Sequence, residues 1–560
     1  MLCAKVCPVN RTGEECVYEG EDKKAKILED KCIGCGICVQ KCPTKAITIV
    51  NLPEAFNSTP IHKYGESGFQ LFDLAIPLFG KVVGIIGKNG IGKSTAMKIL
   101  AGLMKPNFKT DKEAEIDEII QHFKGTEAQL YFERLRDNKI TISYKPQLVE
   151  QIAKQFSGTV RELLSKVSEE KLGKTAELLD LQKVLDTDIT KISGGELQRV
   201  AIAATIMKDA NVYCFDEPTN YLDIKQRIRV SKVIKSLAKD NVAVLVIEHD
   251  LIILDYIADI VHIMYGKENA YGITSQPKTT KAGINVYLSG YLREENVRFR
   301  DKPVTFEARP PPEVHRDTQL CTWPSMKQEL GNFTFEAGPG IVHMHDIIGI
   351  LGENGIGKTT FMKALTMIEA ETKHGKLRIS YKPQYITTQN TSVLEYINDA
   401  LQYELQLMKP LELHDLLERN LDELSGGQLQ RVAIARCLAA DADLYLLDEP
   451  SAYLDVEQRL LMSKVIRDMM TAKGKACLVV DHDLLFIDYI AEKLIVFAGK
   501  PALHGKAEGP FSMHAGMNAF LNDLNITFRR DEESRRPRIN KEGSVLDKEQ
   551  KAKGNLYYTG

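Results

Sequence analysis

Two phosphate-binding loops, each followed by the same series of further motifs, constrain the fold of this chain more than any other feature. Residues 87–95 and 352–360 both fit the pattern G-x-x-x-x-G-K-[ST]. Glycines in such a loop let backbone N–H groups approach phosphate oxygens, the lysine reaches the terminal phosphates, and the hydroxyl binds Mg²⁺. We therefore expect ATP at both loops, held by Gly87, Asn89, Gly90, Gly92, Lys93, Ser94, Thr95, Gly352, Asn354, Gly355, Gly357, Lys358, Thr359 and Thr360.

The motifs downstream of each loop recur in the same order and at similar spacing, so the chain contains an internal repeat. They are Ile-Ser-Tyr-Lys-Pro-Gln (142–147 and 379–384), Ser-Gly-Gly-x-Leu-Gln-Arg (193–199 and 425–431), Asp-Glu-Pro (216–218 and 448–450), Tyr-Leu-Asp (221–223 and 453–455) and His-Asp (249–250 and 482–483). A single loop arises by chance in some globular proteins. Two loops with everything downstream repeated predict two related nucleotide-binding domains.

This set of motifs resembles the nucleotide-binding domains of ATP-binding-cassette (ABC) proteins, over residues 60–300 and 320–530. The resemblance implies an α/β fold in which two ABC-type P-loop ATPase cassettes face each other head to tail. Each ATP would lie between the phosphate loop of one cassette and the Ser-Gly-Gly signature of the other. The signature residues that would act in trans, at a helix N-terminus, are Ser193, Gly194, Gly195, Ser425, Gly426 and Gly427.

The remaining motif residues suit the chemistry of ATP hydrolysis. Lys93 and Lys358 would stabilise charge on the transferred phosphoryl group. Glu217 and Glu449 are placed to orient or deprotonate the attacking water, because a carboxylate facing a dry phosphate site suits that role. The residues expected to contact or sense the γ-phosphate are His249, His482, Gln147 and Gln384. Those expected to hold Mg²⁺ are Ser94, Gln147, Asp216, Thr359, Gln384 and Asp448.

Adenine usually stacks on an aromatic side chain upstream of the phosphate loop of such a cassette. Tyr64 or Phe69 fits this role at the first loop. Trp323, which is the only tryptophan of the chain, fits it at the second loop. The alternative for each of these three residues is packing in the core of its own domain.

The two halves differ at two positions beside these motifs. The residue that follows the Ser-Gly-Gly signature is Glu196 in the first half and Gln428 in the second. The residue before the motif histidine is Glu248 in the first half and Asp481 in the second. We therefore expect the two sites to hydrolyse ATP at unequal rates, and the sequence does not indicate which site is faster.

The bulk properties of the chain exclude several classes of protein. Its 560 residues give room for two large α/β domains and a small additional one. The net charge of −3 gives no whole-chain attraction to nucleic acid or to a membrane. No stretch approaches the roughly 18–20 apolar residues that span a bilayer, and no signal peptide is visible. We therefore expect a cytoplasmic protein, with the nucleus as a second location, that has no membrane domain.

Seven of the eleven cysteines lie within the first 42 residues. The run from Cys32 to Cys42 is C-x₂-C-x₂-C-x₃-C, a spacing typical of bacterial ferredoxins, in which the fourth cysteine binds the other cluster. A zinc site is the alternative, but three close cysteines followed by a Cys-Pro pair favour a [4Fe–4S] cluster. Disulfides are disfavoured beside an ATPase of the cytosolic type.

Upstream, Cys3 and Cys7 resemble the end of a first motif of the same kind. The crossed arrangement assigns one [4Fe–4S] cluster to Cys7, Cys32, Cys35 and Cys38. A second cluster would take Cys3 and Cys42 and lacks two ligands, and we favour an N-terminally truncated chain over a lost cluster. Cys16 is a substitute ligand in principle, but it lies outside the motif and a buried thiol is the favoured interpretation.

A ferredoxin-like head followed by two cassettes narrows the resemblance to the E-type ABC proteins, the ribosome-recycling ATPases also called the RNase L inhibitor family. Family-like segments occupy residues 283–285, 526–531 and 535–541. The resemblance implies ATP-driven splitting of ribosomes after termination, with the small subunit, its rRNA and a release factor as partners. It also implies roles in translation initiation and ribosome biogenesis, pairing of the cassettes within a monomer, and no binding to DNA. The principal alternative is a redox-linked ATPase whose ferredoxin-like head transfers electrons.

One insertion distinguishes the first half. From the loop lysine to the motif glutamine is 54 residues in the first half and 26 in the second, and the extra residues fall over about 110–140. Ile116, Ile119 and Phe123 recur at helical spacing, and Thr126 with Gln129 reads as a capping box that opens a second helix. In the E-type family this helix-loop-helix contacts ribosomal RNA and protein. The alternative is a solvent-exposed surface insertion that has no binding role.

The last residues of the chain mix bases with acids. The six cations between Arg529 and Lys541 are interspersed with Asp531, Glu532 and Glu533, which favours a salt-bridged hinge over an RNA-binding arm. Arg298 and Arg300 would be its counterpart between the cassettes. The expected divisions are a ferredoxin-like domain (1–55), cassette 1 (60–295), a hinge or linker (296–318), cassette 2 (319–525) and a C-terminal hinge segment (526–560).

Overall fold

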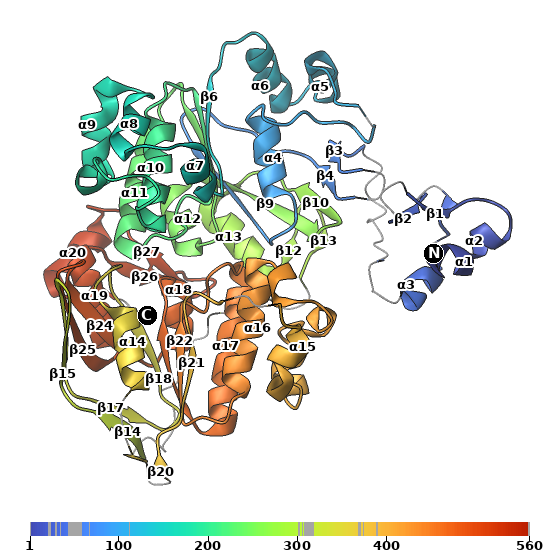
Figure 1. The fold of residues 1–560 in the computed structure, drawn as a ribbon. Coiled ribbons are helices and arrows are strands. Elements are labelled where there is room, and N and C mark those ends of the chain that lie inside the picture. Colours follow the sequence, from blue (N-terminus) through green and yellow to red (C-terminus); the bar gives the residue numbers. More distant parts are fainter. Residues whose placement is uncertain are drawn as a thin grey trace.

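Two α/β bodies lie one against the other in the computed structural model, and a small N-terminal body lies to one side (Figure 1). Among the described residues, no helix is both long and apolar enough to cross a bilayer. The linker predicted over 296–318 is described only in part. The structure describes the whole chain apart from residues 1, 21–23, 29–30, 34, 43–46, 48–58, 66–67, 111, 301–302, 305, 307–317, 368–370, 373–374, 388–389 and 558–560.

Cassette 1 is built around a mostly parallel sheet whose centre leads into the first phosphate loop. Strand β5 (Val82–Gly87) runs into this loop and then into helix α4 (Lys93–Leu100). Every residue of β5 is buried, because parallel sheets are covered on both faces. The strand order is β3-β4-β10-β9-β5-β8-β7-β6, and β11 pairs with β9. The other strands are β3 (His62–Lys63), β4 (Gln70–Phe72), β6 (Ile142–Lys145), β7 (Val212–Asp216), β8 (Ala243–Ile247), β9 (Ile260–Lys267), β10 (Tyr271–Thr274) and β11 (Lys278–Thr279).

Three of the repeated motifs open helices of cassette 1, because each contains a residue that caps a helix N-terminus. Ser193 caps α10 (Gly194–Ile206), Asp223 caps α11 (Ile224–Leu237) and Asp250 caps α12 (Leu251–Ile257). The signature is therefore held at the start of a helix, as expected. The other elements include α7 (Glu150–Gln155), α8 (Val160–Ser165), α9 (Glu169–Leu178), α13 (Thr280–Ser289), β12 (Tyr291–Leu292) and β13 (Val297–Arg298).

Cassette 2 repeats this architecture. Its sheet has the order β15-β16-β25-β24-β18-β23-β22-β21, and β18 (Ile347–Leu351) leads through the second loop into α14 (Lys358–Thr366). The other long strands are β14 (Gln319–Trp323), β15 (Met326–Leu330), β16 (Phe333–Ala337), β17 (Gly340–His343), β21 (Ile379–Lys382), β22 (Leu444–Asp448), β23 (Ala476–Val480), β24 (Lys493–Lys500) and β25 (His504–Ser512). The helices include α15 (Val393–Tyr396), α16 (Gly426–Ala439), α17 (Val456–Lys473), α18 (Leu484–Ile490) and α19 (Met513–Leu524).

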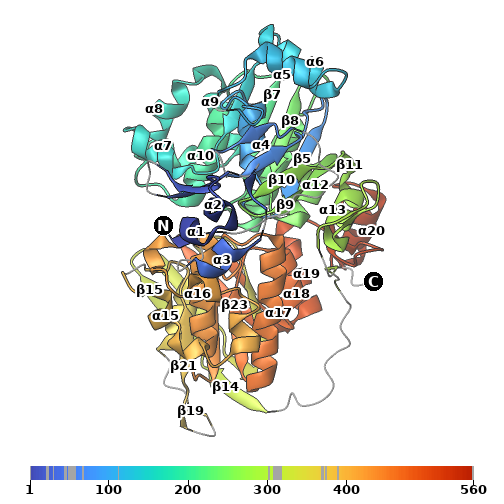
Figure 2. The ribbon, with the colours of Figure 1, turned by 90° about the vertical axis from the view of Figure 1, so that its right-hand side faces the viewer.

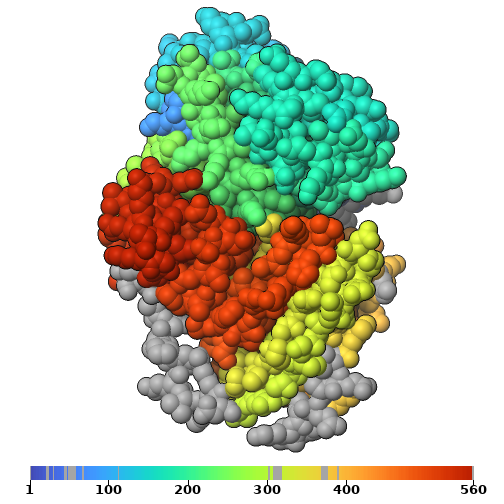
Figure 3. Space-filling model, turned by 90° about the vertical axis from the view of Figure 1, so that its left-hand side faces the viewer, coloured from blue at the N-terminus to red at the C-terminus, as the bar shows by residue number. Residues whose placement is uncertain are grey.

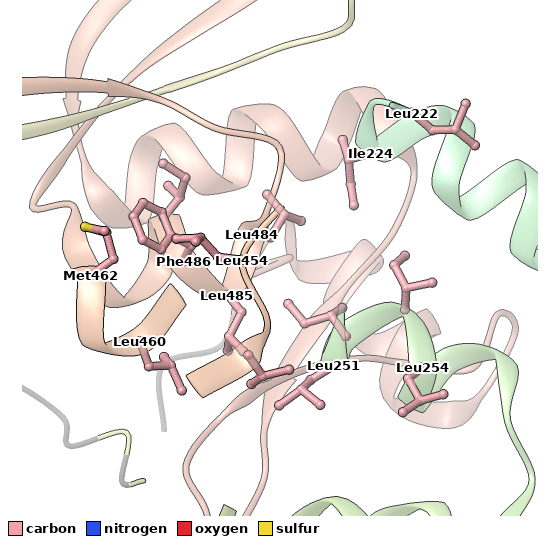
Figure 4. Close-up of a cluster of buried hydrophobic side chains, with 14 of the residues drawn as sticks. Leu222, Ile224, Leu251, Leu254, Leu454, Leu460, Met462, Leu484, Leu485 and Phe486 are labelled. Carbon is pink, nitrogen blue, oxygen red and sulfur yellow. The ribbon is translucent and has the colours of Figure 1, made fainter. Parts of the chain in front are cut away.

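Apolar side chains from both cassettes meet at their boundary. Helix α12 of cassette 1 contacts α18 of cassette 2, and the buried side chains on either side belong to one continuous cluster. Removing such side chains from water stabilises the contact by roughly 25 cal/mol per Å² of apolar area. Figure 4 shows this junction, with Leu222, Ile224, Leu251 and Leu254 from cassette 1 and Leu454, Leu460, Met462, Leu484, Leu485 and Phe486 from cassette 2.

The C-terminal segment crosses from cassette 2 to cassette 1. It contains β26 (Phe528–Arg530), β27 (Pro537–Ile539) and α20 (Val545–Lys553), and β27 contacts α12. Asp255 of α12 accepts hydrogen bonds from Arg536 at 3.2 Å and from Arg538 at 2.6 and 3.0 Å. Figure 3 shows this red segment lying against the green surface of cassette 1. These paired arginines fit a salt-bridged hinge.

The two linker arginines make different contacts. Arg300 forms an ion pair with Glu457 on α17 of cassette 2 and also donates to the carbonyl of Tyr287 at 2.7 Å. Arg298 lies over the ring of Tyr291 within its own hairpin. Arg300 thus bridges the cassettes, whereas the contact described for Arg298 is local.

The insertion forms two short helices, α5 (Ile116–His122) and α6 (Glu127–Arg136), which contact each other. Helix α6 begins after Thr126, but the predicted capping box is wrong. The side chain of Gln129 accepts from the N–H of Gly125 at 2.8 Å, and the hydroxyl of Thr126 donates to the carbonyl of Phe123 at 2.7 Å. The tight turn at Gly125, with φ of 82°, brings that N–H to Gln129 in place of the N–H of Thr126.

The N-terminal body is a small α/β unit that lies in front of the boundary between the cassettes in Figure 2. Its described elements are α1 (Leu2–Val6), α2 (Pro8–Arg11), β1 (Val17–Glu19), β2 (Ala25–Ile27) and α3 (Ile37–Lys41). Strands β1 and β2 pair antiparallel, and α1 contacts α3. This packing brings the two cysteine motifs together.

Candidate active site: two composite nucleotide sites

One cavity of about 1850 Å³ lies between the cassettes, and both phosphate loops and both signatures line it. The opposed placement confirms the predicted head-to-tail arrangement. Of the residues predicted to bind ATP or Mg²⁺ or to act in hydrolysis, Gly87, Gly352, Asp216 and Trp323 are the ones that do not line the cavity. Those that do are Tyr64, Phe69, Asn89, Gly90, Gly92, Lys93, Ser94, Thr95, Gln147, Ser193, Gly194, Gly195, Glu217, His249, Asn354, Gly355, Gly357, Lys358, Thr359, Thr360, Gln384, Ser425, Gly426, Gly427, Asp448, Glu449 and His482.

The phosphate loops hold their lysines in a fixed position. Lys93 Nζ donates to the carbonyl of Gly87 at 2.9 Å, and Lys358 Nζ donates to Gly352 at the same distance. Burial lowers the pKa of Lys93, and it lowers the pKa of Lys358 to about 8. The ammonium groups therefore lie in poorly hydrated positions where a phosphate would be a favourable partner.

The predicted Mg²⁺ ligands lie beside one another at each loop. Thr359 Oγ1 donates to Asp448 Oδ2 at 2.8 Å. In cassette 1, Ser94 lies close enough to Asp216 to oppose the rise in the pKa of that carboxyl group. Burial raises the pKa of both aspartates. The second oxygen of Asp216, Oδ1, is buried and accepts no hydrogen bond from any residue that the structure describes. An unsatisfied carboxylate oxygen beside a loop hydroxyl fits a hard divalent cation such as Mg²⁺.

The predicted catalytic glutamates have closely similar surroundings. Gln147 Nε2 donates to Glu217 Oε1 at 2.9 Å, and His249 Nε2 lies 3.2 Å from the same oxygen. In cassette 2, the corresponding distances from Glu449 Oε1 are 2.8 Å to Gln384 and 3.5 Å to the histidine. Burial opposes ionisation of both glutamates, but the neighbouring histidine, loop lysine and glutamine outweigh it and lower each pKa to about 2. Both carboxylates are therefore charged at neutral pH.

The aspartates of the Tyr-Leu-Asp motifs connect the two cassettes directly, a role that the sequence motif alone did not reveal. Asp223 accepts a hydrogen bond from the N–H of Asn354 in the second phosphate loop at 3.0 Å. Asp455 accepts from the N–H of Asn89 in the first loop at 3.2 Å. Each aspartate also caps a helix of its own cassette. The sequence feature that could have pointed to this role is the occurrence of the Tyr-Leu-Asp motif in both halves.

Trp323 is not placed to stack on a nucleotide, which corrects the prediction for this residue. Its side chain is 4% exposed, packs edge-on against Phe361 and donates to the carbonyl of Gly338 at 3.0 Å. Phe333 lines the cavity in its place. The spacing to the loop lysine could have identified Phe333 from the sequence. Phe333 precedes Lys358 by 25 residues, and Phe69 precedes Lys93 by 24.

The two candidates at the first loop occupy different places. Phe69 packs beneath the loop, where a Cβ on Gly92 would come within 2.6 Å of its ring, and Gly92 has φ of 84°. Tyr64 is 42% exposed, and its hydroxyl lies 3.1 Å from that of Thr95. Tyr64 therefore has the freer ring face of the two.

The two differences between the halves have unequal structural consequences. Glu248 accepts from Thr219 at 2.7 Å and Asp481 accepts from Ser451 at 2.7 Å, so both acids perform the same task. At the signatures, Ser193 Oγ donates to Glu196 at 2.7 Å, whereas Ser425 has a neutral amide, Gln428, at that position. Glu196 places a negative charge beside the signature that faces the second phosphate loop.

Five thiols line one small cavity in the N-terminal body: Cys7, Cys16, Cys32, Cys35 and Cys38. Four of them are the predicted ligands of the first cluster, and this set of sulfur donors fits a [4Fe–4S] group. Burial and the neighbouring Cys7 and Cys32 raise the pKa of Cys16 to about 12, and the Cys16 side chain is 1% exposed. Cys3 and Cys42 do not line this cavity.

Comparison with known proteins supports the two cassettes and the iron–sulfur domain. The ABC transporter family matches residues 76–220 and 340–452, and the 4Fe-4S binding domain matches residues 25–48. The chain is 42% identical to the translation initiation factor RLI1 of Saccharomyces cerevisiae over 99% of its own length and 95% of that protein. It is also similar to archaeal ABCE1 in a model of ribosome-bound Pelota and ABCE1, with 49% identity, a TM-score of 0.90, and coverage of 100% of this chain and 96% of that one.

The chain belongs to the E family of ABC ATPases. A crystal structure of the archaeal ribosome recycling factor aABCE1 with the ribosomal stalk protein aP1 is 49% identical, with a TM-score of 0.84, and covers 89% of this chain and 99% of that chain. This E-family ATPase therefore binds and hydrolyses ATP with Mg²⁺ and carries a [4Fe–4S] cluster. When it is bound, the group would be held by the sulfur atoms of Cys7, Cys32, Cys35 and Cys38.

Proposed function

We propose that this E-family ATPase splits ribosomes into subunits after termination, with the small subunit and a release factor as partners, and that it acts in the cytoplasm. The observation that carries the proposal is the composite cavity, in which each phosphate loop faces the signature of the other cassette. Such an arrangement makes ATP binding and cassette closure one event. The relatives named for ribosome recycling and for translation initiation support the ribosome as the object on which closure acts.

The proposed cycle follows from the cross-cassette contacts. ATP binds the closed pair more tightly than the open pair, because only the closed pair offers both the loop and the signature, and this difference shifts the population toward closure. Asp223 and Asp455 then hold the opposed loops by the hydrogen bonds described above. Hydrolysis, assisted by Glu217 and Glu449, removes the γ-phosphate contacts and permits reopening. The N-terminal body, which precedes cassette 1 in the chain, is driven against the ribosome by this movement.

Sedimentation of purified ribosomes tests the proposal. The protein, a release factor and either ATP or no nucleotide are incubated with ribosomes, and the fractions of subunits and intact ribosomes are measured. We expect splitting with ATP, no splitting without nucleotide, and no repeated turnover for Glu217→Gln combined with Glu449→Gln. Intact ribosomes in every nucleotide condition, from a preparation that hydrolyses ATP, would exclude this function while leaving the ATPase assignment in place.

A further inference from the structure

Two buried lysines have no part in the site as described above. Lys145 and Lys382 are the lysines of the repeated Ile-Ser-Tyr-Lys-Pro-Gln motif, and they are 0% and 1% exposed. Lysine is almost never fully buried unless it is paired. Neither residue lines the nucleotide cavity. A buried lysine at the same motif position in both halves indicates a role inside the protein.

Each lysine ends at the backbone of a catalytic glutamate. Lys145 Nζ donates to the carbonyl of Asp216 at 2.9 Å and to that of Glu217 at 3.2 Å. Lys382 Nζ donates to the carbonyl of Asp448 at 2.8 Å and to that of Glu449 at 3.2 Å. Three donors on a long stem let one lysine hold two successive carbonyls.

The backbone at the glutamates needs such support. Glu217 has φ of 48° and Glu449 has φ of 49°, in the left-handed region that is unfavourable for a residue other than glycine. Residues keep such a conformation only where the surroundings over-determine it. The N–H of Glu217 donates to Ile247 at 3.0 Å, and its carbonyl accepts from Lys145 and, at 2.8 Å, from Gln198 of the signature helix.

The second half repeats every one of these contacts. The N–H of Glu449 donates to Val480 at 2.8 Å, and its carbonyl accepts from Lys382 and from Gln430 at 2.5 Å. Both ends of each glutamate backbone unit are therefore tied to the surrounding framework. The direction of the carboxylate follows from that backbone, because the Cα–Cβ bond is fixed by φ and ψ.

We infer that Lys145 and Lys382 are positioning residues, which with Gln198 and Gln430 hold the strained backbone of Glu217 and Glu449 so that each carboxylate points at the γ-phosphate. The inference rests on the assignment of these glutamates as catalytic and adds the residues that aim them. A shift of about 1 Å at such a group costs of the order of 100-fold in rate.

The test compares Lys145→Met, Glu217→Gln and the double variant in steady-state ATP turnover, with Mg-ATP affinity measured separately. Glu217→Gln defines the turnover that remains when the first glutamate does not act. Lys145→Met should change turnover most of the way from the wild-type value to the Glu217→Gln value. The Kd for Mg-ATP should stay within about twofold of wild type. The double variant should match Glu217→Gln, because a residue that acts only through Glu217 adds nothing once Glu217 is replaced. Lys382→Met with Glu449→Gln provides the matched pair.

Two further variants provide a control for the loss of a lysine and an alternative test of the inference. Lys239→Met, at an exposed position between α11 and β8, is the control for a lost surface lysine and should retain wild-type turnover. Gln198→Leu removes the other side-chain donor to the Glu217 carbonyl and decides the matter if Lys145→Met does not fold.

Two results would overturn the inference. One is wild-type turnover in Lys145→Met, or in Gln198→Leu where that variant decides. The other is a double variant that differs from Glu217→Gln by the same factor that separates Lys145→Met from wild type, since this shows an effect independent of the glutamate. An unchanged turnover in Glu217→Gln itself would instead reject the assignment of Glu217.

Discussion

Replacing Asp255 by Asn tests whether a buried ion pair holds the C-terminal segment against cassette 1. Asp255 accepts three hydrogen bonds from Arg536 and Arg538, and the Asp255 and Arg536 side chains are 4% and 0% exposed. Asn keeps the size of the side chain and removes its charge, so Arg536 stays buried without its nearest carboxylate. Removing one partner of a buried pair costs about 3–5 kcal/mol.

The magnitude can be converted into a melting temperature. At about 2–4 °C for each kcal/mol in a domain of 150–250 residues, a loss of about 3 kcal/mol lowers the melting temperature by about 6–12 °C. The assay is thermal unfolding at pH 7 followed by circular dichroism. Glu532→Gln is the matched control, because Glu532 is an exposed carboxylate on the same segment and should change the stability by less than about 0.5 kcal/mol. A melting temperature for Asp255→Asn equal to that of the control would refute the reasoning.

Three other outcomes follow from particular side chains. Phe333→Ala should weaken ATP binding at the second loop, because Phe333 packs beneath Gly357 as Phe69 packs beneath Gly92, whereas Trp323→Phe should leave the Kd unchanged in an ATP titration. Cys38→Ser should remove about four iron atoms per chain, measured by iron analysis, while Cys16→Ser should retain them. Burial opposes ionisation of Asp531, but hydrogen bonds from Ser534 and Asn285 outweigh it and lower its pKa from 3.8 to about 2. That carboxylate stabilises the fold above pH 3.8 and loses its contribution as the pH falls through about 2, so Asp531→Asn should flatten this part of an acid-unfolding curve.

The sequence predicted the architecture well because the two halves of the chain can be compared with each other. Each motif occurs twice at matched spacing, and spacing fixes which strand end or helix start a motif occupies. Glu217 and Glu449 illustrate this, since both follow a buried strand and both are found beside the loop lysine of their own cassette.

The sequence failed where a contact depends on tertiary packing. Trp323 has an aromatic ring of the kind that stacks on adenine, but the two-stranded sheet of β14 and β17 places it in the core against Phe361. Thr126 and Gln129 have the spacing of a capping box, but the turn at Gly125 presents a different N–H. The cross-cassette hydrogen bonds of Asp223 and Asp455 join residues more than a hundred positions apart, and no local pattern predicts such a pair.

The most direct test of the account measures the distance between the cassettes by single-molecule energy transfer. Dyes are attached at Lys239 in cassette 1 and Lys327 in cassette 2, both of which are exposed. We expect Mg-ATP to shift the population to the closed state and Glu217→Gln with Glu449→Gln to hold it there. Identical distributions with and without Mg-ATP, in a preparation that hydrolyses ATP, would contradict the claim that nucleotide binding at the composite sites closes the pair.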